Sequence, residues 1–197
     1  ARPVNDTAPT SVRTIRRTLI EAVQGLPVHV DILTPGSYEA LAQHLETSFE
    51  QHGIGYYHII QFDIDGAYLS YAELQANQEH YRMQNRYGRS TLEAYEGKRP
   101  FLFMEDAQEG VIDLVEPTEL VDILINHQIS LVFLAAYRSQ VVGNLACTLR
   151  AQGSPLVLAL NYPMNMHSVK LFMRTLYEHM IVGDYLSTAV TKARSQL

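Results

Sequence analysis

The chain has 197 residues, of which 47% are apolar and 18% charged, a composition typical of one globular domain rather than a disordered segment. Its formal net charge of −6 argues against general attraction to nucleic acid or anionic membranes, and no apolar run is long enough to span a bilayer. The single cysteine, Cys147, excludes an intrachain disulfide and a cysteine zinc site, so we expect a buried thiol in a cytoplasmic protein.

The first part of the chain alternates helical and extended patterns. Apolar residues between 12 and 23 recur at helical spacing, and residues 28–33 alternate apolar and polar side chains, which predicts a strand near a sheet edge. Ser37 is a good N-cap for the next helix, which we expect to end near Gly53. A strand follows at 57–63.

Residues 67–100 show the least regular pattern and carry many basic and aromatic side chains. Such interleaving suits a contact with RNA or a peptide. The simpler interpretation, which we favour, is a surface insertion packed by its own tyrosines. The side chains concerned are Tyr81, Arg82, Arg86, Tyr87, Arg89, Tyr95, Lys98 and Arg99.

The second half predicts a hairpin over 101–114 and a helix opened by Pro117, then a strand over 129–136. This apolar run, rich in Val, Phe and Leu, is typical of a strand buried on both faces in a parallel sheet. A helix carrying Cys147, a strand over 155–160 and two closing helices follow, the last with Asp184 as its expected N-cap. This alternation predicts an α/β protein with a mainly parallel sheet.

In open α/β sheets, ligands and chemistry gather just past the carboxyl ends of the strands. Strands 57–63 and 129–136 both run into polar residues there. If these strands are neighbours, Asp65 and Tyr137 face each other at one edge of the sheet. Ser139 as a nucleophile with Asp65 as its base is disfavoured, because no imidazole stands between them. The histidines show no metal-binding spacing and no glycine-rich phosphate loop is present, so no cofactor is expected.

Two stretches, Tyr57-His-Ile-Ile-Gln-Phe-Asp-Ile-Asp-Gly66 and Val132-Phe-Leu-Ala-Ala-Tyr-Arg-Ser139, resemble motifs of the CHAT domains, which are caspase-like cysteine peptidases. The likeness extends to Leu156-Val-Leu-Ala-Leu-Asn-Tyr-Pro163 and thus covers nearly the whole chain. It implies a three-layer caspase-like fold, with a mainly parallel central sheet, helices on both faces and a small β-hairpin insertion. Residues 1–197 would form a single such domain that lacks its first strand and is excised from a longer chain, with 67–100 as a surface insertion.

The two catalytic positions of the family are both substituted. Asp65 stands where the resemblance places the catalytic histidine, and Tyr137 stands where it places the nucleophilic cysteine. A phenol with a pKa near 10 is not a thiolate, and a carboxylate does not accept and then donate a proton near neutral pH as an imidazole does. The resemblance therefore implies an inactive pseudopeptidase in which Tyr137 fills the vacated pocket and hydrogen-bonds Asp65. The remaining pocket residues would be Asp63, Gly66, Ala136, Arg138 and Ser139.

Three functions stay open at this point. The resemblance favours a regulatory or scaffold module for a protein or peptide partner, which would be an active caspase-like subunit or attached repeat domains. The second is a peptidase that uses non-standard residues such as Ser139. The third is a peptide or nucleic-acid sensor that uses the pocket and residues 67–100, although nucleic acid is not expected from the net charge.

Overall fold

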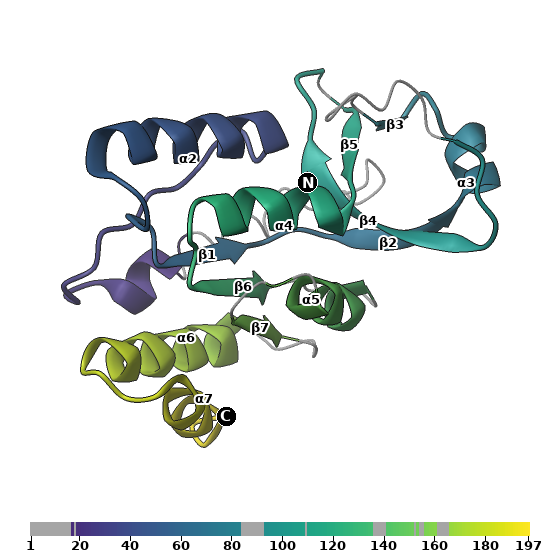
Figure 1. Ribbon diagram of the computed structural model, residues 1–197. Coiled ribbons are helices and arrows are strands. Elements are labelled where there is room, and N and C mark those ends of the chain that lie inside the picture. The colour runs from purple at the N-terminus through teal and green to yellow at the C-terminus, as the bar shows by residue number, and fades with distance from the viewer. Residues whose placement is uncertain are drawn as a thin grey trace. The chain divides into compact units, whose positions relative to one another are not determined.

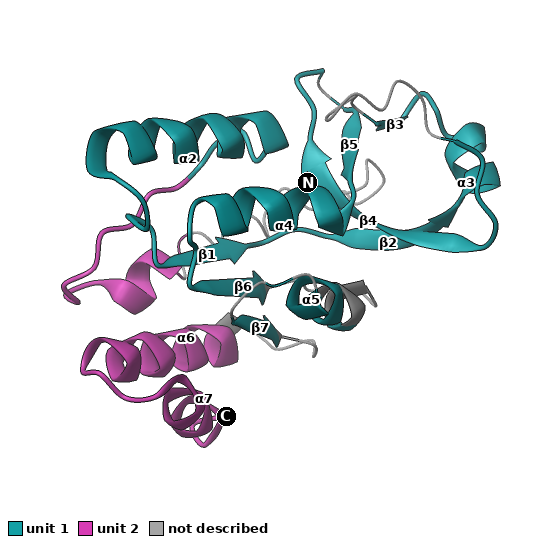
Figure 2. Cartoon of the chain, in the orientation of Figure 1, with its two compact units in different colours: residues 1–6, 33–162 teal, residues 7–32, 163–197 magenta. Residues whose placement is uncertain are grey.

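The structure is a computed structural model, and it divides the chain into two compact units, each described separately (Figure 2). The larger unit comprises residues 1–6 and 33–162, and the smaller comprises residues 7–32 and 163–197. The residues that the structure describes are 17, 19–83, 93–108, 110–135, 141–151, 153, 156–160 and 166–197.

The described part of the chain is mixed α/β with two sheets, which confirms the predicted class (Figure 1). Within it, no helix has both the length and the apolar character needed to cross a membrane. The elements in chain order are α2 (Tyr38–His52), β1 (Ile59–Phe62), β2 (Gly66–Ser70), α3 (Tyr71–Ala76), β3 (Tyr81–Arg82), β4 (Lys98–Glu105), β5 (Ile112–Val115), α4 (Pro117–Asn126), β6 (Leu131–Ala135), α5 (Val141–Ala151), β7 (Val157–Leu160), α6 (Met166–Ile181) and α7 (Leu186–Arg194).

The first sheet is parallel, with the order β1-β6-β7. Its register aligns apolar residues in rows across the strands, one of them Phe62, Leu134 and Ala159. This row and the row of Ile60, Val132 and Val157 pack with α2, α4 and α5 in one core cluster. Leu131 and Phe133 on alternate positions of β6 are also buried, so the central strand is buried on both faces, as the apolar run predicts.

The second sheet has the order β2-β4-β5-β3, with antiparallel pairs except for β3 with β5. Strand β4 is its centre, and its residues alternate between two cores because successive side chains point to opposite faces. Leu102 and Met104 join the core of the parallel sheet, whereas Phe101 and Phe103 pack with Leu74 and other side chains in a second cluster. The predicted hairpin over 101–114 is therefore confirmed as β4 and β5.

Local capping signals set the helix boundaries in this unit. The Ser37 hydroxyl accepts a hydrogen bond from the Ala40 N–H at 3.1 Å and opens α2, as predicted. Gly53 ends α2 with a φ of 87°, a conformation that costs glycine little. Pro117 occupies the first turn of α4, where its missing N–H has no helical partner to lose.

The smaller unit contains α6 and α7, joined by a turn at Gly183 with a φ of 90°. The prediction of Asp184 as the N-cap of α7 is wrong, because Tyr185 takes that position. The Asp184 carboxylate instead lies 2.9 Å from His179 Nδ1 and 3.0 Å from Lys192 Nζ, so it links the two helices. Hydrogen bonding to Lys192 lowers the pKa of Asp184.

Two other sequence expectations fail. Residues 28–33 form no strand, and Val28, Val30 and Ile32 are exposed. An alternating pattern makes a strand only where a neighbouring strand accepts its hydrogen bonds, and neither sheet of the described structure includes this segment. The described residues of 67–100, which are 67–83 and 93–100, are more regular than predicted, since they hold nearly all of β2, then α3, β3 and the start of β4.

Candidate functional site

The predicted site lies at the carboxyl ends of β1 and β6. These strands are parallel neighbours, which is the condition on which the predicted site depends, and the register pairs Phe62 with Leu134 at their ends. The first residues after β1 therefore lie at the same edge of the sheet as the end of β6. Of the residues expected there, Ala136, Tyr137, Arg138 and Ser139 lie outside the described residues, so their placement stays a prediction.

The two carboxylates after β1 occupy different surroundings. One oxygen of Asp63, Oδ2, is buried at the end of the strand. By Asp65 the chain has entered the second sheet, since the carbonyl oxygen of Asp65 accepts a hydrogen bond from the Phe103 N–H at 2.9 Å. The backbone of Asp65 is thus held between the end of β1 and β4, and this fixes the position of its Cα atom.

Gly66 is required by packing rather than by an unusual backbone angle. A Cβ at this position would lie 2.5 Å from the carbonyl oxygen of Phe101, well inside van der Waals contact. Gly66 pairs with Leu102 across β2 and β4. The close approach of the two backbones therefore anchors the turn that carries Asp63 and Asp65.

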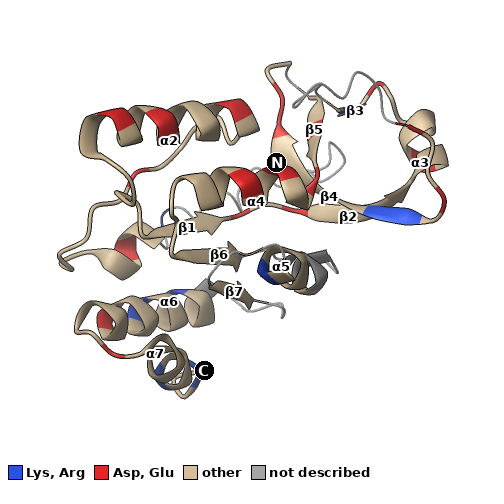
Figure 3. Ribbon diagram, viewed as in Figure 1, with Lys and Arg blue, Asp and Glu red and all other residues tan. Residues whose placement is uncertain are grey.

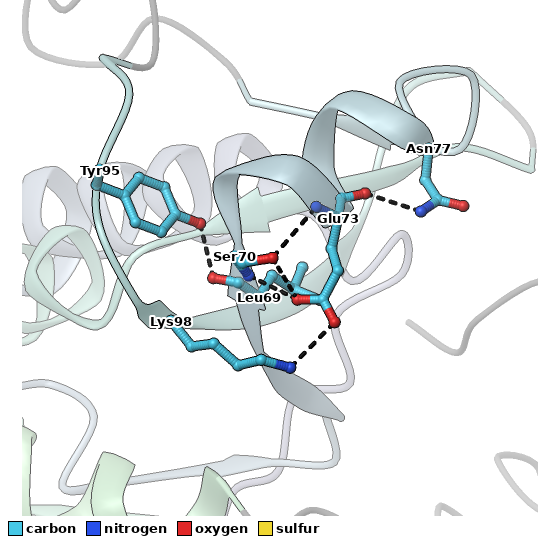
Figure 4. A network of polar contacts seen from close by, with 6 residues as sticks. All are labelled: Leu69, Ser70, Glu73, Asn77, Tyr95 and Lys98. Atoms are coloured by element: carbon cyan, nitrogen blue, oxygen red, sulfur yellow. Dashed lines mark hydrogen bonds and ion pairs between the residues drawn. The ribbon is translucent and has the colours of Figure 1, made fainter.

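Tyr95 and Lys98, from the basic and aromatic set predicted in 67–100, belong to a structural network at α3 (Figure 4). Arg86, Tyr87 and Arg89 of that set lie outside the described residues. Ser70 and Glu73 form a capping box, in which the Ser70 N–H donates to Glu73 Oε2 at 2.7 Å. Lys98 Nζ donates to the other oxygen of Glu73 at 3.0 Å. The backbone hydrogen bond from Ser70, with a smaller effect of Lys98, lowers the pKa of Glu73 to about 2.

Tyr95 and Arg99 complete this network, and Arg82 forms a separate ion pair. The Tyr95 hydroxyl donates to the Leu69 carbonyl at 2.7 Å, and the Arg99 guanidinium lies 4.4 Å from the centre of the Tyr95 ring. Desolvation raises the pKa of Tyr95. Arg99 also lies 3.7 Å from Glu116, and Arg82 lies 3.2 Å from Asp106. The three basic side chains described between 67 and 100 are therefore each paired with a carboxylate, which is unlike an open phosphate-binding groove.

Two features were missed or misjudged from the sequence. Cys147 is exposed, so the predicted buried thiol is wrong. On α5 it lies two residues, or about 200°, from the buried Leu149 and so faces away from the core. Asp113 is fully buried within β5. The sequence signal for this burial is that Asp113 is a carboxylate inside an otherwise apolar stretch. No group of three potential metal ligands is found among the described residues.

A second surface of the larger unit was also missed. The end of α2 and the loop after it expose Phe49, Ile54 and Tyr56 around a shallow depression, whose lining includes Tyr57 and His127. The sequence signal for it is weak, because Phe49 continues the apolar stripe of α2 and reads as a core residue.

Comparisons with known protein families, with curated proteins and with solved structures find no significant match for this chain.

Proposed function

We propose that this chain is a catalytically inactive caspase-like domain, which acts as a regulatory or scaffold module for protein–protein interaction. The observation that supports the proposal is the pairing of β1 with β6 as parallel neighbours. In the family that the sequence resembles, these two strands lead to the catalytic histidine and cysteine. Here they lead to Asp65 and Tyr137.

The chemistry of these two residues does not replace a thiol–imidazole pair. Cysteine peptidases attack with a thiolate that an adjacent imidazole generates, and the protonated imidazole then donates to the leaving amine. Asp with an ordinary pKa near 4 is already deprotonated at neutral pH, so it has no proton to donate. A tyrosine with an ordinary pKa near 10 stays protonated and is a poor nucleophile.

The proposal includes a contact between the two substituted positions. We propose that the Tyr137 hydroxyl fills the space of the former nucleophile and hydrogen-bonds Asp65, beside the partly buried Asp63. Such a contact would stabilise the strand ends and close the former active site. The partner of the domain would then be a folded protein or a peptide that is bound and not cleaved.

The direct test is turnover of a fluorogenic peptide library by the purified chain between pH 6 and pH 8. The proposal predicts no cleavage above the buffer control. The matched variant is Ser139→Ala, which removes the alternative nucleophile that the sequence offers at the strand ends. Cleavage by the unaltered chain that disappears in Ser139→Ala would contradict the proposal and favour a peptidase with non-standard residues.

A further inference from the structure

The surface that calls for an explanation lies at the C-terminal end of α2, away from the strand ends. Phe49 is 42% exposed, Ile54 53% and Tyr56 37%, and they lie together around one shallow depression or in the loop beside it. Large apolar side chains that are exposed as a group, rather than singly, mark interaction surfaces. We call this surface the aromatic face, defined by Phe49, His52, Ile54, Tyr56, Tyr57 and His127.

The rings of the aromatic face hold each other in place. The His52 and Tyr56 rings stack at 4.1 Å, and Tyr57 meets Tyr56 edge-on at 4.9 Å. Tyr57 is itself fixed by a 2.7 Å hydrogen bond between its hydroxyl and His44 Nε2. Rings that are ordered before binding lose little conformational entropy when a partner arrives, which favours affinity.

Apart from its histidines, the aromatic face has only acidic charged side chains in the two helices beside it and the loops that follow them. Residues 38–58 and 117–130, which contain α2 and α4 with their following loops, include no Lys or Arg. In Figure 3 both helices carry red segments and no blue. The two helices are neighbours, since the Tyr38 hydroxyl donates to the Glu119 carbonyl at 3.2 Å. The carboxylates of these segments are Glu39, Glu46, Glu50, Glu119 and Asp122.

Two of these carboxylates border the aromatic face directly. Glu46 Oε2 lies 3.7 Å from Nε2 of His127, and the Glu46 side chain is 63% exposed. Glu50 follows four residues later on the same side of α2, one position after Phe49. Exposed rings beside carboxylates that no Lys or Arg of the described structure pairs with match a guanidinium, which stacks on an aromatic plane and pairs with carboxylates through its outer N–H groups.

We infer that the aromatic face binds an arginine-bearing segment of a partner protein. The guanidinium stacks against Tyr56 and pairs with Glu46 and Glu50, while a neighbouring apolar side chain enters the depression beside Phe49. The acidic rim disfavours nucleic acid and anionic lipid, and it favours a cationic protein segment. This surface is separate from the strand ends and does not depend on the loss of the catalytic pair, so it goes beyond the proposed function.

The test starts with a displayed library of random 12-residue peptides selected on the full chain. Enriched sequences are synthesised with a fluorescein label, and their affinity is measured by fluorescence anisotropy at 50 and 300 mM NaCl. We expect enriched peptides to share an arginine next to an apolar residue. Replacing that arginine by citrulline, which removes the charge and keeps the shape, should weaken binding on the order of tenfold.

Variants of the chain then locate the site. Tyr56→Ala should weaken binding on the order of tenfold, and Glu46→Gln with Glu50→Gln should weaken it about fivefold while flattening its salt dependence. The matched controls are Glu79→Gln with Glu96→Gln, which removes the same charge from exposed positions elsewhere, and Tyr185→Ala, which removes an exposed ring from the smaller unit. Both should leave the affinity unchanged, and thermal unfolding verifies that every variant is folded.

The inference is overturned if the selection enriches no peptide or enriches peptides without a basic residue. It is equally overturned if Tyr56→Ala and the double glutamate variant bind the selected peptides as the unaltered chain does. A loss of affinity in the controls that equals the loss in Tyr56→Ala also contradicts it. Peptidase activity is not read in any of these measurements, so their outcome is distinct from that of the cleavage assay.

Discussion

Two surfaces of the larger unit, the corner at α3 and the aromatic face, differ in how their charged side chains are paired. At α3 the described basic side chains each have a carboxylate partner, as Lys98 has Glu73 at 3.0 Å. At the aromatic face the carboxylates have no Lys or Arg from α2 or α4 beside them. The difference teaches that the described basic and aromatic side chains near α3, namely Tyr95, Lys98 and Arg99, stabilise a corner of the fold. The surface suited to a partner lies where the sequence shows no basic motif.

The largest expected effect is at the close packing of β2 against β4, in the sheet beside the α3 corner. Gly66→Ala would place a Cβ 2.5 Å from the Phe101 carbonyl oxygen, which belongs to a central strand and has no room to shift. We predict a loss of about 2 to 3 kcal/mol in the free energy of unfolding, measured by urea denaturation.

Gly36→Ala is the matched control for this prediction. A Cβ there would meet its nearest atom, Glu105 Cδ, only at 3.8 Å. Its stability should stay within about 0.5 kcal/mol of the unaltered chain. Equal losses of stability in the two variants would show that the pairing of β2 with β4 does not depend on the close packing at Gly66.

A smaller effect should appear in the acid stability of the α3 corner. The pKa of Glu73 falls from 4.5 to about 2 on folding, so its carboxylate stabilises the fold above the unfolded pKa. This contribution should be lost as the pH falls from about 5 through about 2. We predict that the free energy of unfolding drops less over this range in Glu73→Gln than in the unaltered chain. If Glu73→Gln and the unaltered chain titrate in parallel, the capping box does not stabilise the corner as its geometry implies.

The smallest effect is expected on the stability of the aromatic face itself. Removing the charges of Glu46 and Glu50 breaks no ion pair with Lys or Arg in the described structure, so the free energy of unfolding should change by no more than about 0.5 kcal/mol. Thermal unfolding at neutral pH measures this change. A large destabilisation would mean that these carboxylates stabilise the fold, and the contrast between the two surfaces would then fail.

The parts of the fold that were predictable depend on local rules. The N-cap at Ser37, the opening of α4 at Pro117 and the hairpin of β4 and β5 each follow from a few neighbouring residues. The central strand was also predictable, because a double-sided apolar run has few other uses. Its pairing with the strand after α2 placed the candidate site at one sheet edge.

The features that were missed depend on contacts between distant parts of the chain. The alternation at 28–33 predicts a strand but does not supply a partner for it. Asp184 has the side chain of an N-cap, yet its carboxylate is held by Lys192, in the last turn of α7, and by His179. Phe49 continues an apolar stripe that the core no longer covers at the end of α2. Exposure of this kind is set by tertiary packing and leaves no trace in the local pattern.

The most direct test of the central claim concerns the pairing of positions 65 and 137. In a Cys147→Ser background, which removes the exposed native thiol, the variant Tyr137→Cys is compared with Tyr137→Cys combined with Asp65→His. The rate of alkylation by iodoacetamide is measured between pH 5 and pH 9. An imidazole beside the introduced thiol should lower its pKa, so the combined variant should react on the order of tenfold faster at pH 6. Equal rates in the two variants would contradict the account, because the two positions would then not be partners.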